Sequence, residues 1–220
     1  MIRATLLSAA VLAAVPAAAS ADVGLGPATS FKAAFTTHHA GRASGLVLRT
    51  TGKPPAPGTT EPAAVRQTVT FPAGTKLRLR VLPQCRASDA ELAAQGAAAV
   101  CPMRTRVGSG RAEGVLGGKP VGFDLAAYAV RGRLFFAAGK QGFWGVGHGR
   151  RLALTTPTLN GMIAPTLFRA KLPARAGWLR TPRTCHGHWR FGATFQGLTA
   201  VDGTPVGAAQ HLAYRQACGG

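Results

Sequence analysis

The chain has 220 residues, with 26 Lys and Arg against seven Asp and Glu, and a formal net charge of +19. A field of this sign attracts polyanions of any kind, whereas seven carboxylates leave few pairs for carboxylate-based catalysis. The length suits one large all-β domain or two small ones. The basic residues are spread along the chain rather than gathered in a run, so a purely compositional origin of the charge stays open.

Residues 1–21 have the features of a secretory signal peptide. Arg3 is followed by an apolar stretch at 4–15 and by small residues before Asp22. The apolar stretch is interrupted by Pro16 and is too short to span a bilayer. We therefore expect a secreted or otherwise extracytoplasmic protein with no transmembrane segment in its mature chain.

The segment 22–62 is expected to form an N-terminal hairpin and a Pro-rich loop. Its strand candidates are 31–36 and 46–50, and four prolines follow within 51–62. The remainder, 63–220, is expected to be the body of the protein, and one domain that includes 22–62 is favoured over two.

Two alternating stretches follow the loop. Residues 65–71 end at a Pro-Ala-Gly turn, and 76–81 alternate between cations and apolar residues, which predicts a half-buried antiparallel strand. The cations of the second stretch, Lys76, Arg78 and Arg80, form the densest one-sided basic stripe in the sequence. They are candidates for polyanion contacts, although a solvated sheet face is the default interpretation of such a pattern.

A short helix is predicted after this stripe. Ser88 and Glu91 are spaced as a capping box, alanines then favour the helix, and Gly96 is a plausible stop. Such a helix is marginal on its own. A bridge between Cys85 and Cys101 would hold it, contributing about 3 kcal/mol in the chain-entropy model.

The four cysteines are best explained by two disulfides, because the chain is expected to be exported. Three pairings are possible, and we favour the two that are local in sequence, Cys85–Cys101 and Cys185–Cys218. No C-x-x-C spacing supports a zinc site instead.

The second half of the chain is a succession of short strand candidates separated by turns. Residues 142–149 are glycine-rich and are predicted to form a mobile loop with Phe143 and Trp144 folded inward. Residues 189–196 alternate cleanly, and Asp202-Gly203 is a hairpin signal. The other strand candidates are 106–115, 121–130, 134–138, 150–155 and 166–172. The pattern predicts an all-β, antiparallel β-sandwich, Ig-like or jelly-roll-like, with one short disulfide-bracketed helix.

Several short motifs together resemble a group of uncharacterised secreted proteins of high-GC actinobacteria. The motifs are Thr-Phe-Pro-Ala-Gly at 70–74, Leu-Pro-Gln-Cys at 82–85, Cys-Pro at 101–102, Val-Gly-Ser-Gly at 107–110, Thr-Pro-Arg-Thr-Cys at 181–185, Trp-Arg-Phe at 189–191 and Asp-Gly at 202–203. The resemblance implies secretion, a β-rich fold and disulfides, and it carries no activity. His186 departs from the pattern, which has proline there.

Candidate catalytic groups are sparse. Ser109, Asp124 and His148 occur in an order that a triad could use, but the residues around Ser109 do not form G-x-S-x-G. Apart from Glu61 in the Pro-rich loop, Glu113 and Asp124 are the carboxylates not already assigned to a cap, a turn or a terminus. These residues define the alternative hypothesis, a secreted hydrolase.

Histidines could also hold a metal. His186 and His188 would share one face of an extended segment, but two ligands are an incomplete set for zinc. We therefore expect no metal and no cofactor.

The favoured hypothesis is a non-enzymatic, exported, basic β-sandwich that associates electrostatically with the cell envelope or another polyanion. A protein partner of unknown kind is the other possibility. Because the aromatic residues alternate as core positions, sequence-specific nucleic-acid binding is not expected.

Overall fold

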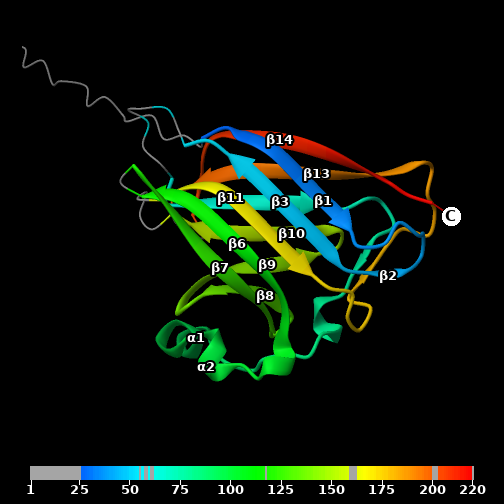
Figure 1. The fold of residues 1–220 in the computed structure, drawn as a ribbon, viewed down its shortest axis with the longest axis horizontal. Helices are drawn as coiled ribbons and strands as arrows, with labels where there is room; N and C mark the ends of the chain where they lie inside the picture. The colour runs from blue at the N-terminus through cyan, green and yellow to red at the C-terminus, as the bar shows by residue number, and fades with distance from the viewer. Residues whose placement is uncertain are drawn as a thin grey trace, which may run out of the picture.

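A computed structural model describes residues 26–54, 56, 59, 62–116, 118–158, 163–199 and 203–219. These residues form fourteen strands, two α-helices and two 3₁₀-helices (Figure 1). The strands are β1 (Ala28–Phe35), β2 (Ala43–Ser44), β3 (Leu46–Gly52), β4 (Ala64–Thr70), β5 (Lys76–Leu77), β6 (Arg106–Leu116), β7 (Lys119–Val130), β8 (Arg133–Ala138), β9 (Gln141–His148), β10 (Arg151–Pro157), β11 (Ile163–Leu172), β12 (Leu179–Arg180), β13 (His188–Leu198) and β14 (Pro205–Ala217). The helices are η1 (Leu79–Val81), α1 (Asp89–Gln95), α2 (Ala97–Val100) and η2 (Met103–Thr105).

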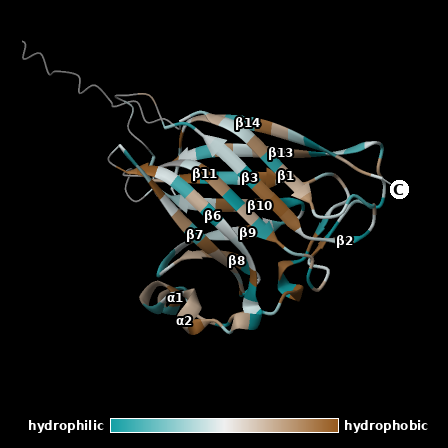
Figure 2. Ribbon diagram, viewed as in Figure 1, coloured by the Kyte–Doolittle hydropathy of each residue, from teal (hydrophilic) through white to brown (hydrophobic). Residues whose placement is uncertain are grey.

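Eleven strands belong to one antiparallel sheet in the order β1-β3-β11-β6-β7-β8-β9-β10-β4-β13-β14. The sheet folds over on itself, so that β1, β3, β11 and β6 run diagonally in front of β9, β10 and β13 (Figure 1). Apolar side chains from both layers meet between them, as the alternation of hydropathy along the strands allows (Figure 2). The predicted antiparallel β-sandwich is confirmed, and its two layers are parts of one continuous sheet.

The two edge strands of this sheet, β1 and β14, are joined by glutamine side chains. Gln216 accepts from the backbone N–H of Phe35 at 2.8 Å and donates to its carbonyl oxygen at 2.9 Å. Gln210 accepts from the N–H of Ala28 at 2.7 Å. These amides take the place of ladder hydrogen bonds, so two strands far apart in sequence satisfy edge groups that would otherwise be unpaired.

The stretch 76–81 is not the single strand that its alternation predicts. Only Lys76–Leu77 is extended, as β5 of a three-stranded sheet with β12 and β2, and Leu79–Val81 forms η1. Leu79 is buried, and the backbone N–H of Arg78 donates to the carbonyl of Trp178. Alternation alone could not predict this change, because the burial of Leu79 against the large sheet bends the chain.

The short helix forms as predicted. Ser88 Oγ accepts from the Glu91 N–H at 3.1 Å, the Glu91 carboxylate accepts from the Ser88 N–H at 2.6 Å, and Gly96 follows at a φ of +83°. Cys85 and Cys101 are bonded to each other across it, as predicted. A second short helix, α2, begins directly after Gly96.

The helical segment covers the outer face of β7 and β8. Leu92 and Ala97 pack there with Tyr128, Val130 and Phe135 in a second, smaller core. These two strands are therefore buried on both faces. This explains why 125–130 and 134–138 are almost continuously apolar in sequence.

The glycine-rich segment 142–149 was expected to be a mobile loop, and this prediction is wrong: Gln141–His148 is strand β9. A Cβ on Gly145 would lie 2.9 Å from Leu154 Cδ2, so glycine is needed there for close packing rather than for mobility. Phe143 points into the core as expected. Trp144 alternates to the other side, where the Arg133 guanidinium lies 3.7 Å from its ring centroid.

The C-terminal hairpin is formed by β13 and β14, which pair antiparallel from Leu198↔Pro205 to His188↔Ala217. The predicted bond between Cys185 and Cys218 is present near its open end. Asp202 and the segment 1–21 lie outside the described residues. The described part of the chain contains no helix with the length and apolar character needed to cross a bilayer.

Candidate functional site: a row of basic side chains

Four basic residues lie directly opposite one another across four neighbouring strands. Lys32 of β1 pairs with Arg49 of β3, Arg49 pairs with Arg169 of β11, and Arg169 pairs with Arg111 of β6. Residues paired in this way project from the same face of a sheet, about 5 Å apart at their Cβ atoms. Lys32, Arg49 and Arg169 are exposed, and the alternate residues of their strands are buried in the core. We call these four residues the basic row.

Carboxylates neutralise only one end of the basic row. Arg111 donates from Nε to Glu113 at 2.6 Å and from Nη1 to Asp124 at 3.2 Å. The bond to Glu113, and then the bond to Asp124, raise the pKa of Arg111 above its usual value. Lys32, Arg49 and Arg169 have no ion pair within the described residues.

The shortage of acidic partners extends over the whole described structure. All of the Lys and Arg residues except Arg3 are described, against four acidic residues: Asp89, Glu91, Glu113 and Asp124. Each of the four already has a partner, since Asp89 binds Arg133 and Glu91 binds the Ser88 cap. The unpaired cations of the basic row are therefore available to an external anion.

Like charges at directly opposite positions destabilise a sheet. The row therefore costs folding free energy. Elsewhere in the sheet, Arg66 lies opposite the neutral Gln196 and Thr155, and Arg190 and Arg215 form a second, isolated pair of opposed cations. A cost of this kind is typical of functional surfaces.

The predicted stripe of Lys76, Arg78 and Arg80 lies elsewhere. All three side chains are exposed, but the turn into η1 breaks the single face on which a strand would have placed them. A Cβ built on Gly132 would come within 3.0 Å of Arg80, so that side chain lies along the β7–β8 turn. Whether these residues contact a polyanion stays a prediction.

The candidate triad is not assembled. Ser109 lies on the exposed outer side of β6. The register of the strands between them, β7 and β8, places Ser109 level with Gly142 of β9. His148 is six residues further along that strand, which is roughly 20 Å at the usual rise per residue. Asp124 binds Arg111 and is not near the imidazole. The three groups therefore cannot act on one substrate atom.

The carboxylate pair is also in the wrong arrangement for glycoside hydrolysis. Glu113 and Asp124 both bind Arg111, so a guanidinium occupies the space that a sugar would need between them. The Asp124 side chain is 87% exposed and stands on the outer face of the sheet instead of in a cleft.

The histidines do not converge either. Arg190 Nε donates to His188 Nε2 at 3.4 Å, which places a cation beside one candidate ligand. The described residues contain no group of three or more His, Cys, Asp or Glu side chains placed to hold a metal ion.

Sequence reasoning missed the basic row because its members come from four segments that are far apart in the chain. All four residues fall within strands that the sequence predicts, at 31–36, 46–50, 106–115 and 166–172, and this is the one signal that the sequence contains. Which strands are neighbours, and in what register, is decided by the fold.

No protein-family model and no curated protein matches this sequence. Among solved structures, the chain is similar to the T6 backbone pilin of serotype M6 Streptococcus pyogenes, with a TM-score of 0.40, 8% identity and coverage of 86% of this chain. It spans about a third (35%) of the length of that pilin. A second similar structure is AvmM, which catalyses macrocyclization in alchivemycin A biosynthesis, with a TM-score of 0.28, 12% identity and coverage of 90% and 92% of the two chains. Likenesses at this level transfer neither a substrate nor a partner.

Proposed function

We propose that this is an exported, non-enzymatic protein that binds a polyanion of the cell envelope through the outer face of β1, β3, β11 and β6. The observation that carries the proposal is the basic row, in which Lys32, Arg49 and Arg169 lack acidic partners among the described residues. Lys171 adds a further cation two residues after Arg169 on the same face.

Two other features support the proposal. The disulfides are typical of proteins that mature in an oxidising compartment, and the sequence of 1–21 has the pattern of a secretory signal. The candidate catalytic groups are far apart or held by Arg111, which favours a binding role over hydrolysis.

Binding of fluorescently labelled inorganic polyphosphate, followed by anisotropy across a KCl series, tests the proposal. Cations that contact phosphates release counterions, so log K should fall linearly with log salt, by about 0.7 to 0.9 per contact. Replacing Arg49 and Arg169 together by Gln removes two contacts, so the slope should become shallower by about 1.5 and the affinity at low salt should fall.

The chain offers a closely matched control. Arg190 and Arg215 are also directly opposite each other, on the outer faces of β13 and β14, so replacing both by Gln changes the net charge equally. We expect this control to affect binding much less. Equal losses for the two double variants would mean that net charge alone attracts the polyanion, and absence of binding at low salt would refute the proposal.

A further inference from the structure

A cavity of about 420 Å³ lies between the two layers of the sheet. Its walls come from the ends of strands, including Thr50 and Gly52 at the end of β3 and Val65 at the start of β4. Ligand pockets in proteins usually have volumes of about 300 to 1,000 Å³ and mostly apolar walls. The cavity therefore has the size of a small-molecule site. None of the four residues of the basic row lines it, although Glu113, the partner of Arg111, does.

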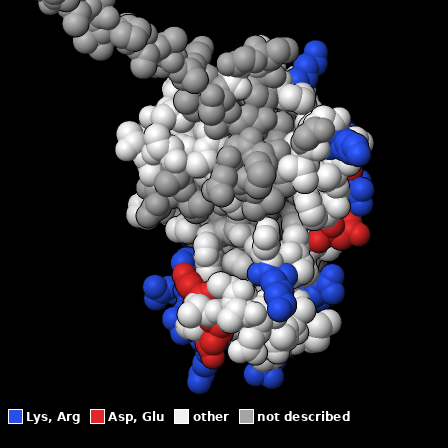
Figure 3. Space-filling model, turned by 90° about the vertical axis from the view of Figure 1, so that its left-hand side faces the viewer, with Lys and Arg blue, Asp and Glu red and all other residues white. Residues whose placement is uncertain are grey.

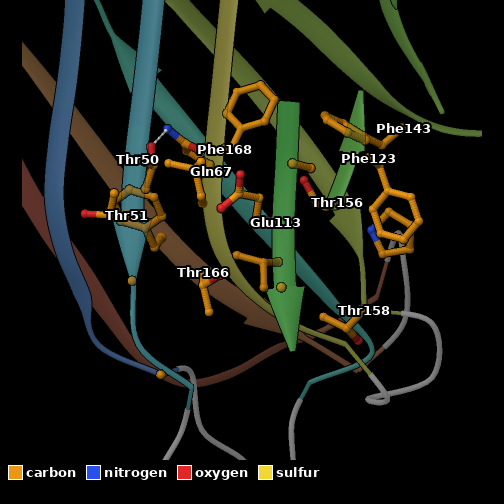
Figure 4. Close-up of a pocket in the computed structure, with 18 of the residues that line it drawn as sticks. Thr50, Thr51, Gln67, Glu113, Phe123, Phe143, Thr156, Thr158, Thr166 and Phe168 are labelled. Carbon is orange, nitrogen blue, oxygen red and sulfur yellow. Dashed lines mark hydrogen bonds between the residues drawn. The ribbon is translucent and has the colours of Figure 1, made fainter. Parts of the chain in front are cut away.

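Aromatic side chains form much of the wall. Phe143 and Phe168 meet edge to face with ring centroids 5.7 Å apart, and Phe168 also packs on Phe136. Phe123, opposite Ala112 on the neighbouring strand, lines the cavity yet is 41% exposed. The close-up in Figure 4 shows the rings of Phe123, Phe143 and Phe168 around the same space as Gln67 and Thr50.

Most of the described lining of the cavity is uncharged. Of its described lining residues, only Lys53 and Glu113 ionise; Lys53 is exposed, and Glu113 is held by Arg111. Figure 3 shows the molecule from the left-hand side of Figure 1, the side toward which β3 points. The charged side chains visible there stand along the right-hand edge and around the lower part of the molecule. An ionic ligand would therefore lose its hydration without gaining a buried counter-charge.

One polar side chain is buried at the cavity without satisfying all of its hydrogen-bonding capacity. Gln67 is 7% exposed, and its Nε2 donates to Thr50 Oγ1 at 2.9 Å (Figure 4). Its Oε1 has no hydrogen-bond partner among the described residues. Every side-chain oxygen of those residues that is sealed from solvent does have a partner, so Gln67 Oε1 is not sealed. This oxygen is therefore open to the cavity and can accept a hydrogen bond from a bound molecule.

We propose that the cavity binds a neutral, largely aromatic or aliphatic small molecule that carries one hydrogen-bond donor directed at Gln67. The apolar body of the ligand would pack against Phe123, Phe143 and Phe168, and its N–H or O–H would reach Gln67 Oε1. Since a cavity of about 150 Å³ holds one benzene ring, a molecule of two or three rings matches the available volume.

The test uses N-phenyl-1-naphthylamine, a neutral three-ring amine with one N–H whose fluorescence rises in apolar surroundings. The disulfide-bonded protein should bind one equivalent saturably. Replacing Gln67 by Met should weaken binding about fivefold, the usual worth of one hydrogen bond. In competition, 1-phenylnaphthalene, which lacks the N–H, should bind both proteins with similar affinity.

Steric variants locate the probe. A ring added by Ala112→Phe occupies the cavity and should weaken binding by roughly tenfold or more, and Thr156→Phe serves the same purpose if the first variant fails to fold by circular dichroism. Thr68→Val, on the next residue of β4 and the opposite face, should leave binding unchanged. Absence of saturable binding would overturn the proposal, as would binding that persists unchanged when a folded variant fills the cavity.

Discussion

Replacing Arg169 by Gln should make the protein more stable while it weakens polyanion binding. Arg169, like Arg49, has basic neighbours on both sides, and its own neighbours are Arg49 and Arg111. Gln keeps much of the aliphatic stem and removes the charge, so the substitution isolates the electrostatic repulsion. A residue that served only the fold would not show this opposition between stability and binding.

The magnitude follows from the register. A like-charged pair at directly opposite positions costs up to about 1 kcal/mol. The repulsion from Arg111 is reduced because Glu113 and Asp124 hold its guanidinium. We therefore expect the free energy of unfolding to rise by about 0.5 to 1 kcal/mol at low salt. Near 0.5 M salt the Debye length is only about 4 Å, so most of the gain should disappear.

Urea denaturation at low and high KCl measures this gain. Arg66→Gln is the matched control, because Arg66 lies on a central strand opposite the neutral Gln196 and Thr155. Its free energy of unfolding should change little and should not depend on salt. Destabilisation by Arg169→Gln, or a gain equal to that of the control, would refute the reasoning that the row is a strained feature of the fold.

Three further substitutions test the fold. Gln216→Leu leaves the buried N–H and carbonyl of Phe35 without partners and should cost about 2 to 4 kcal/mol in urea denaturation, whereas retained stability would show that the β1–β14 edge needs no bridge. Glu91→Gln should remove a pH dependence of the free energy of unfolding, because hydrogen bonds from Ser88 lower the pKa of Glu91 below its ordinary value. The stability that the ionised Glu91 contributes is complete above the ordinary pKa and is lost as the pH falls through the lowered one. The wild type and variant should therefore converge in acid, and a stability difference independent of pH would contradict this. Gly145→Ala should lower the free energy of unfolding by about 1 to 3 kcal/mol through overpacking. Gly192→Ala should lower it far less, because the new Cβ would meet its nearest neighbour at 3.9 Å. Equal losses for the two variants would point to backbone effects instead of overpacking.

Local chemistry was sufficient to predict several elements from sequence. The capping box of Ser88 and Glu91, the stop at Gly96 and both cysteine pairings were predicted correctly, because each depends on residues close in the chain. The alternation of apolar and polar residues was also sufficient to predict strand β13, since one face of that strand is buried and the other is not. By contrast, the stretch 76–81 and the glycine-rich β9 were misassigned, because packing against distant residues decides their conformation.

The sequence by itself determined that this is an antiparallel β protein with two local disulfides and a large excess of positive charge. The tertiary structure decided which of these charges lie side by side. Lys32, Arg49 and Arg169 become neighbours only through the register of three strands, and Gln67 faces a cavity only because two layers diverge around it. Periodicity shows which face a side chain takes, but long-range strand pairing determines what lies beside it.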